Sequence, residues 1–298
     1  MDGLLIVDKP EGPTSHDIVV RIRRALGERR IGHTGTLDPM ASGVLALLLG
    51  RATRLARFLA ADEKTYEAEI RLGRATDTYD MKGSPLGPPH EGPLPDRTSV
   101  DRALDPFRGA FLQQPPPYSA KRIDGTRSYT LARRTAAPPM PAPAPVAARR
   151  IDLLELDADL LRLRIVCSAG FYVRSLAHDL GASLGTGAHL ARLRRTAAGG
   201  FALDDAVTAD AVERDPRRAA QRIIPPAGML PGLTAARLNE GGEHRVAHGR
   251  DLGPGDLLER LAGQPTSGVK LLDRQGRLVA IAEARTGSGL LHPSVVLM

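Results

Sequence analysis

Apolar and polar residues alternate along several stretches of the chain with the two-residue period of a β-strand. Residues 63–73 place apolar side chains at every second position, which predicts a half-buried strand. Residues 151–157 and 160–167 follow the same period and are expected to pair through a turn at residues 157–159. A short apolar run at residues 4–7 predicts one more strand, which ends in a turn rich in Pro and Gly.

Other stretches repeat apolar residues every three or four positions, which is the period of an α-helix. One predicted helix begins at Ser15, a residue type that caps helices, and stops at Gly27. Another follows Gly170 and is stopped by Gly185. Two further predicted helices span residues 52–60 and 99–107.

The last part of the chain has an all-β pattern. Residues 270–284 favour a hairpin with its turn at residues 273–276. His244 and His248 have the spacing of two metal ligands on a helix, but a zinc site needs three or four ligands and no third one is evident. The sequence therefore predicts no metal site.

The length of 298 residues fits two domains, or one large domain with a small addition. An apolar share of 42% is ample for a buried core, and no apolar run reaches the roughly 20 residues that span a bilayer. The N-terminus lacks the basic start of a signal peptide, so a soluble, cytoplasmic protein is expected. The single cysteine, Cys167, excludes an internal disulfide and a cysteine metal cluster.

The net charge of +7 suits a polyanionic partner, and nucleic acid is the first candidate. The alternative is a composition bias, because Arg greatly outnumbers Lys and the residues Ala, Gly, Pro and Leu are abundant. Aromatic residues make up only 3% and Trp is absent, so broad stacking on single-stranded bases is not expected. A few well-placed aromatic side chains would have to contact the bases.

Residues 30–45 form a polar, glycine-rich stretch that leads into an apolar run. Pro39 biases Asp38 towards extended backbone geometry, which fixes the direction of its side chain. Three glycines let this backbone turn sharply or approach a ligand: Gly32, Gly35 and Gly43. A lone acid in such a basic loop is a candidate site, while the alternative is an ordinary turn aspartate without chemistry.

This stretch resembles the catalytic motif of the TruB family, the bacterial tRNA pseudouridine-55 synthases. In that family the motif reads Gly-His-Thr-Gly-x-Leu-Asp-Pro-x-Ala-x-Gly-x-Leu, and every fixed position is met from Gly32 to Leu45. The resemblance implies that Asp38 is the catalytic aspartate. It also implies that His33 enters the gap left by the target base.

Two strands resemble further motifs of the family. Residues 5–12 match Leu-x-x-x-Lys-Pro-x-Gly, which implies that Lys9 supports the structure near the active centre. The Lys-x-Tyr strand implies that Tyr66 packs against the target base. Residues 168–176 resemble Ser-x-Gly-Thr-Tyr-Ile-Arg-Ser-Leu, which implies that Arg174 pairs with the catalytic aspartate and that Tyr172 contacts the substrate.

Residues 185–196 resemble the family motif Gly-x-Gly-Ala-x-x-x-x-Leu-Arg-Arg-Thr. The match implies that Leu193 orients the uracil, with Arg194 and Arg195 as supporting residues and candidate phosphate contacts. Residues 76–83 match Thr-Asp-Thr-x-Asp-x-x-Gly, and their acids are expected to bond backbone amides in a loop near the site.

The resemblance also implies the domain organisation. Residues 1–228 would form the catalytic domain, an α+β fold with a mixed, mainly antiparallel sheet and flanking helices. Residues 116–125 resemble Pro-x-Tyr-Ser-Ala-x-Lys-x-x-Gly, which begins a mobile thumb-like insertion at about 112–148, although Arg122 replaces the usual lysine. Residues 229–298 would form a small β domain similar to the PUA domain, an RNA-binding module.

The implied activity is the isomerisation of uridine to pseudouridine at position 55 in the T arm of tRNA. The nucleotide must leave its stack to be reached, and a carboxylate then acts at C1′ as a nucleophile or as a base. Arg174 would keep Asp38 ionised. A neutral isomerisation needs no redox cofactor, so none is expected. The expected partner is the tRNA T stem-loop, with no membrane or protein partner and a monomeric chain.

Two other functions remain open from the sequence. A tRNA-folding chaperone would use the same basic surface and would not need Asp38. A phosphate-binding hydrolase built on the loop from Gly32 to Gly35 is a weaker candidate, because no P-loop lysine pattern is present.

Overall fold

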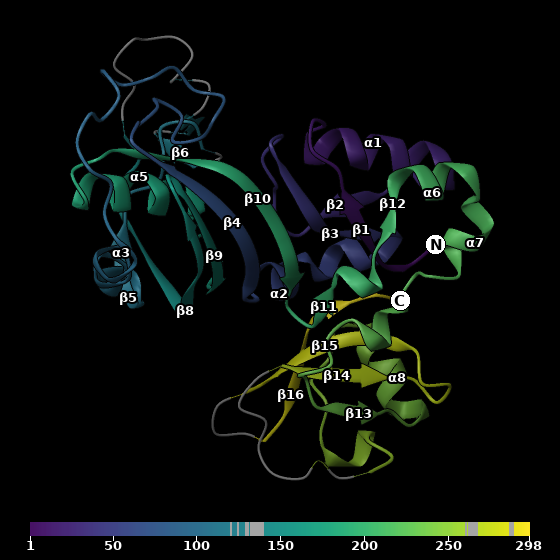
Figure 1. The fold of residues 1–298 in the computed structure, drawn as a ribbon. Coiled ribbons are helices and arrows are strands. Elements are labelled where there is room, and N and C mark those ends of the chain that lie inside the picture. Colours follow the sequence, from purple (N-terminus) through teal and green to yellow (C-terminus); the bar gives the residue numbers. More distant parts are fainter. Residues whose placement is uncertain are drawn as a thin grey trace.

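The computed structural model contains a large mixed sheet with helices on its faces and a small second sheet near the C-terminus (Figure 1). The structure describes residues 1–119, 121–123, 125–128, 131, 140–259, 261, 268–285 and 289–298. Part of the predicted thumb-like insertion, including residues 132–139, therefore lies outside the described residues. Within these ranges, every helix is too short or too polar to cross a bilayer.

Most strands of the large sheet are antiparallel to their neighbours, in the order β12-β1-β3-β10-β4-β9-β8-β5. Two more strands attach to this path, β2 to β3 and β11 to β10. The strands are β1 (Gly3–Lys9), β2 (Ile31–His33), β3 (Ala41–Leu49), β4 (Lys64–Leu72), β5 (Gly109–Gln113), β8 (Ala144–Asp157), β9 (Leu160–Cys167), β10 (Ala188–Ala198), β11 (Phe201–Ala202) and β12 (Val207–Thr208). The short strands β6 (Arg122–Ile123) and β7 (Thr126–Arg127) pair with each other.

The helices that accompany this sheet are α1 (Ser15–Leu26), α2 (Ala56–Ala60), α3 (Arg97–Leu104), α5 (Val173–Ser183), α6 (Ala209–Arg214) and α7 (Pro216–Ala220). Figure 1 places α1, α6 and α7 beside β1 and β12, and α3 and α5 beside β8 and β9. Short 3-10 turns precede α2 and follow α3, at Gly50–Leu55 and Asp105–Phe107. The expected α+β class, with a mixed and mainly antiparallel sheet, is confirmed.

The two halves of the sheet join where β3 runs parallel to β10 over a short register, Leu193–Arg195 against Ala41–Gly43. Gly43 has φ 104°, and a Cβ atom there would overlap the backbone of Arg195, with the amide nitrogen 2.8 Å away. Only glycine permits both this backbone conformation and this approach. The seam directly follows the loop that carries Asp38.

Two predicted helices differ in detail from those observed. The first is capped by Thr14 and not by Ser15, because Thr14 and Asp17 form a reciprocal capping box. Ser15 lies inside the first turn with its side chain buried. The helix predicted at 52–60 begins as the 3-10 turn and is α-helical only over α2.

Apolar side chains fill both faces of β1 and β3. On one face a large core joins these strands to α1, α5 and most of the remaining strands of the sheet. On the other face a second core contains Leu4, Val44 and Leu48 together with Leu278 and Ile281 from the C-terminal region. The two sheets therefore share a hydrophobic core, and the back of β3 packs against the C-terminal sheet.

The C-terminal sheet has the strand order β13-β14-β15-β16 and packs with one helix. Its elements are β13 (Ala235–Arg237), α8 (Glu240–Ala247), β14 (Val269–Leu272), β15 (Leu278–Ala284) and β16 (Leu291–Val296). The predicted hairpin of residues 270–284 corresponds to β14 and β15.

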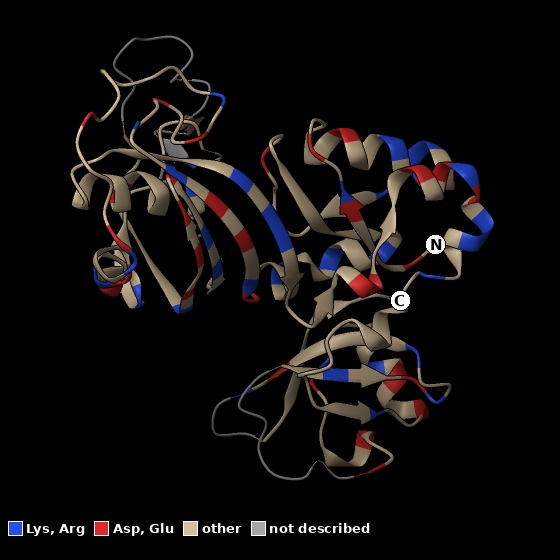
Figure 2. Ribbon diagram, in the orientation of Figure 1, with Lys and Arg blue, Asp and Glu red and all other residues tan. Residues whose placement is uncertain are grey.

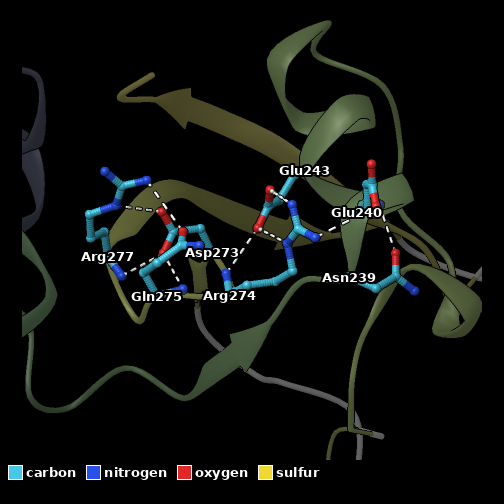
Figure 3. A network of polar contacts seen from close by, with 8 residues as sticks. Asn239, Glu240, Glu243, Asp273, Arg274, Gln275 and Arg277 are labelled. Carbon is cyan, nitrogen blue, oxygen red and sulfur yellow. Dashed lines mark hydrogen bonds and ion pairs between the residues drawn. The ribbon is translucent and has the colours of Figure 1, made fainter.

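A polar network fixes the turn of this hairpin (Figure 3). The Asp273 carboxylate is 2% exposed and accepts hydrogen bonds from the backbone of Gln275 and from the backbone and side chain of Arg277. Arg274 extends the network to Glu243 and Glu240 of α8. Burial alone would raise the pKa of Asp273, but the hydrogen bonds from Arg277 and Gln275 keep it below its ordinary value.

We predict that Asp273→Ala destabilises the protein by about 1–3 kcal/mol, because buried backbone N–H groups of the turn lose their acceptor. Asp273→Asn retains one acceptor oxygen and should cost less. The control is Arg277→Ala, which removes a side chain that is 77% exposed and should change the stability by less than about 1 kcal/mol. Urea unfolding would measure all three, and an Asp273→Ala protein as stable as wild type would contradict the expectation.

Candidate functional site

The loop that carries Asp38 is fixed on both sides of the aspartate. The Ser15 hydroxyl donates to the Leu37 carbonyl at 3.0 Å and accepts from the Leu37 amide at 2.9 Å. After the aspartate, the Pro39 carbonyl accepts from the Gly12 amide at 2.8 Å. The Asp38 side chain itself stays 35% exposed. The loop thus offers a carboxylate to solvent on a backbone that cannot easily shift.

Lys9 is a fully buried cation beneath this loop. Its ammonium group lies 2.7 Å from the Ala41 carbonyl and 2.9 Å from the Pro10 carbonyl, with the Pro39 carbonyl 3.5 Å away. Burial lowers the pKa of Lys9 to about 8, and the nearby charge of Asp38 limits this decrease. The predicted supporting position of Lys9 corresponds to this arrangement.

Arg174, in the first turn of α5, points its guanidinium at Asp38. Its Nε lies 2.8 Å from Asp38 Oδ2, but the N–H is poorly aligned, so the contact is an ion pair and not a well-formed hydrogen bond. Its other two nitrogens donate to backbone carbonyls, Nη1 to Thr78 at 3.2 Å and Nη2 to Tyr118 at 2.9 Å. The expected pairing with Asp38 is present.

One feature of that pair differs from a two-pronged contact. The guanidinium divides its donors among three segments of the chain, and only one nitrogen faces Asp38. The second carboxylate in reach is Asp80, whose Oδ2 lies 3.9 Å from Nη1. Because Arg174 is 5% exposed, these partners compensate a charge that is removed from water.

The loop of residues 76–83 forms one wall of this site. Asp77 accepts from the Ser84 amide and Asp80 accepts from the Lys82 amide, as expected for acids that bond a loop backbone. The Thr78 hydroxyl also donates to Asp80 at 2.8 Å. The same loop supplies the Thr78 carbonyl to Arg174.

Tyr66 and Leu193 lie on one face of the sheet. In the register of β4 and β10, Leu193 is opposite Ala68, and Tyr66 is opposite Arg195. Tyr66 packs against the core, and burial raises the pKa of its hydroxyl, to which the charge of Asp38 adds. Tyr66 and Asp38 are therefore close enough to interact electrostatically.

Tyr172 precedes α5 and is anchored through its backbone. Gln113, which is 2% exposed, donates to the Tyr172 carbonyl at 2.9 Å and accepts from its amide at 2.8 Å. Burial raises the pKa of the Tyr172 hydroxyl, and Asp38 contributes to this rise. Next to it, Phe171 is 8% exposed. Its ring packs edge-on against Phe111, so the core accommodates this large side chain.

His33 ends β2, and burial lowers its pKa, with the charge of Arg195 as a further cause. Its Nδ1 is buried without a hydrogen-bond partner among the described residues. An imidazole that is neutral at pH 7 and partly accessible can stack or insert without the cost of removing a charge from water.

Arg194 and Arg195 point to opposite faces of β10, because successive side chains of a strand alternate. Arg194 is half-exposed and pairs with Asp8 at 2.8 Å. Arg195 is 2% exposed and donates to the carbonyls of Val44 and Gly35. The expectation that Arg195 contacts phosphate is therefore wrong, since its guanidinium is buried and bonded to the backbone of the Asp38 loop and β3.

Three residues make contacts in this site that the sequence pattern does not reveal. Ser15 has the sequence pattern of a helix cap. Gln113 carries no local signal of its role, because its partner lies far along the chain. Asp80 lies in the motif of residues 76–83. That motif predicts a loop near the site but not the approach of Asp80 to Arg174. Each residue acts through a contact that only the folded chain creates.

Basic residues also gather away from this site, along α1 and α7 (Figure 2). Arg24, Arg217 and Arg218 are exposed there. Arg21 is different, because it pairs with Asp210 and Glu213 of α6.

Comparisons with known proteins identify the family of the chain. Residues 23–173 match a family model described as TruB family pseudouridylate synthase (N terminal domain). Residues 174–227 match one described as tRNA pseudouridylate synthase B C-terminal domain. The two models meet beside Arg174.

Two curated relatives, both named tRNA pseudouridine synthase B, are similar over the whole chain. The protein from Solibacter usitatus (strain Ellin6076) is 44% identical over 100% of both chains. The protein from Thermobifida fusca (strain YX) is 40% identical over 99% of this chain and 98% of its own. A chain in the crystal structure of the archaeal box H/ACA sRNP Nop10-Cbf5 complex has a TM-score of 0.73 and 26% identity, over 99% of this chain and 86% of that one.

We predict that Lys9→Met destabilises the protein by about 1–3 kcal/mol, because the carbonyls of Pro39 and Ala41 lose a buried donor. The stability difference should also depend on pH. The folded pKa of about 8 lies below the ordinary value of 10.5, so the unfolded chain binds more protons between these values. The stability of wild type relative to Lys9→Met should therefore increase as pH rises through this window.

Urea unfolding at about pH 7.5 and about pH 9.5 measures this change. The control is the exposed Lys82, whose substitution by Met should leave both values near wild type. A stability difference for Lys9→Met that is independent of pH would contradict the assigned pKa.

Proposed function

The chain belongs to the TruB family of pseudouridylate synthases, and we propose that it isomerises uridine 55 in the T arm of tRNA at Asp38. The observation that carries this proposal is the Asp38–Arg174 ion pair at the end of a rigid, partly exposed loop. A carboxylate in this setting is oriented before substrate arrives. Such preorganisation is the main contribution that a protein makes to charge stabilisation in a reaction.

Pseudouridine formation breaks the N1–C1′ bond, turns the uracil and joins C5 to C1′. Asp38 would act at the sugar, either by attacking C1′ as a nucleophile or by removing a neighbouring proton. Both routes need an ionised carboxylate that is accessible to a flipped-out nucleotide. The 35% exposure of the Asp38 side chain supports that access.

We propose that the residues around Asp38 bind the flipped nucleotide. Tyr66 and Tyr172 would contact the uracil, Leu193 would orient it, and His33 would occupy the space that the base leaves. The electrostatic coupling of both tyrosines to Asp38 supports this arrangement. Arg194 and the buried Arg195 are supporting residues, and Arg195 acts through the Gly35 carbonyl of the loop.

The tRNA would be bound mainly through its phosphates, because such contacts supply most of the affinity of basic proteins for nucleic acid. The exposed arginines of α1 and α7 support this role. Residues 1–228 would be the catalytic domain and residues 229–298 a PUA-like RNA-binding domain. We also propose that the protein acts as a monomer, on tRNA in the cytoplasm.

We predict that Asp38→Asn abolishes pseudouridine formation and leaves the Kd for tRNA within about twofold of wild type. The amide preserves size and removes the charge that acts on the glycosidic bond. Tritium release from C5-labelled uridine in tRNA measures the reaction, and filter binding measures the affinity. If the wild type released no tritium and the Asp38→Asn protein still promoted tRNA folding, the chaperone alternative would be favoured.

We predict that Arg174→Met reduces the single-turnover rate at saturating tRNA by about 100-fold, because a buried charge pair loses one partner. Arg174→Lys should be intermediate, since it keeps a charge but cannot reach Asp38, Thr78 and Tyr118 together. The affinity for tRNA should be unchanged in both. The control is Arg192→Met. Arg192 is exposed on the face of β10 opposite Leu193, so this variant should react at the wild-type rate. If Arg174→Met weakens binding but reacts normally, Arg174 is a phosphate contact.

A further inference from the structure

Tyr79 has an unusual backbone conformation. Its φ is 65°, a left-handed value that is unfavourable for a non-glycine residue. Ala158, in the turn between β8 and β9, is the other non-glycine residue of the described chain with a positive φ. Strain of this kind persists only where surrounding contacts favour it, and it is often found near functional sites.

The side chain of Tyr79 forms an aromatic stack. The phenol ring of Tyr79 lies on the imidazole ring of His178, with 3.8 Å between the ring centroids and 14° between the planes. Burial lowers the pKa of His178, and its Nδ1 has no hydrogen-bond partner among the described residues. The face of this imidazole is used for stacking, while its Nδ1 makes no hydrogen bond to the described residues.

The stack joins two elements that both hold Arg174. His178 follows Arg174 by one turn of α5, so the two side chains lie on the same side of the helix. Thr78, the residue before Tyr79, gives its carbonyl to Arg174 Nη1. On its other side, Tyr79 gives its own carbonyl to the Leu190 amide of β10 at 3.0 Å.

We propose that the stack of Tyr79 on His178 is a positioning device for Arg174, and through Arg174 for Asp38. The inference rests on the proposed function and assigns no chemical step to either ring. The direction of the guanidinium is set by the two carbonyls that receive Nη1 and Nη2. If the loop moves, the Thr78 carbonyl moves with it, the guanidinium rotates, and Nε no longer faces Asp38.

The experiment uses full-length protein, saturating tRNA and single-turnover tritium release. Tyr79→Gly removes the ring but tolerates the positive φ, so the loop can keep its backbone path without its anchor. We expect the rate constant to fall about tenfold, because small misplacements of a reacting group are costly, while the Kd for tRNA stays within about twofold. Tyr79→Phe keeps the ring and should react within about threefold of wild type.

The helix side of the stack provides a second, independent variant. His178→Ala should lower the rate as Tyr79→Gly does. His178→Phe keeps a ring for the stack and should react near the wild-type rate. The double variant Tyr79→Gly/His178→Ala should be no slower than the slower single variant, because both remove the same contact. The matched control is Ala158→Gly, which relieves a positive φ in the turn between β8 and β9 and should leave the rate unchanged.

A Tyr79→Gly or His178→Ala protein that reacts at the wild-type rate would overturn the proposal. A lower melting temperature with an unchanged rate would do the same, because it would show a purely structural contact. A loss of tRNA affinity in parallel with the rate would show that Tyr79 contacts RNA. An inactive wild type or an active Asp38→Asn protein would overturn the proposed function itself. Failure of the positioning proposal alone leaves Asp38 essential to the reaction, so the two failures are distinguishable.

Discussion

The fold depends on the close approach of β3 and β10 at Gly43 and Arg195. This short parallel pairing joins two halves of a sheet whose other neighbouring strands are antiparallel, except for β1 and β12 at one edge. A side chain on Gly43 would overlap the Arg195 backbone, so the strands would have to separate. Because the Asp38 loop leads directly into β3, and β10 lies next to β4, the same pairing brings Asp38 near Tyr66 and Leu193.

Buried cations give the site its rigidity. Lys9, Arg174 and Arg195 are all nearly inaccessible, and each donates to backbone carbonyls of segments that form the site. A buried charge is costly unless polar groups surround it, so each cation constrains the loops that solvate it. A consequence concerns RNA binding, because part of the net charge of +7 is inside the protein and does not contribute to the surface that meets phosphate.

The C-terminal sheet is attached to the site through the back of β3. Leu278 and Ile281 share a core with Val44 and Leu48, which lie on the face of β3 opposite the Asp38 side. A chain cut near residue 228 would expose this apolar surface to water, at about 25 cal/mol for each Å² uncovered. The two regions therefore differ in proposed role but are not independent in packing.

Most strands and helices, and the identity of the central loop, could be predicted from the pattern of residues alone. The alternating pattern of residues 63–73 gave β4 its bounds within one residue, and the density of fixed positions around Asp38 indicated the family. The pairing of Arg174 with Asp38 was expected from that family motif alone.

The contacts of the polar side chains, in contrast, depend on segments that meet only in the folded chain. Ser15 bonds Leu37 and does not cap its helix, Arg195 is buried, and Arg174 shares its guanidinium among three segments. The physical reason is that local periodicity reports which face of an element is apolar, through backbone geometry that neighbours in sequence share. The partner of a buried polar group lies far along the chain, and it is fixed only when strand register and helix packing bring the two together.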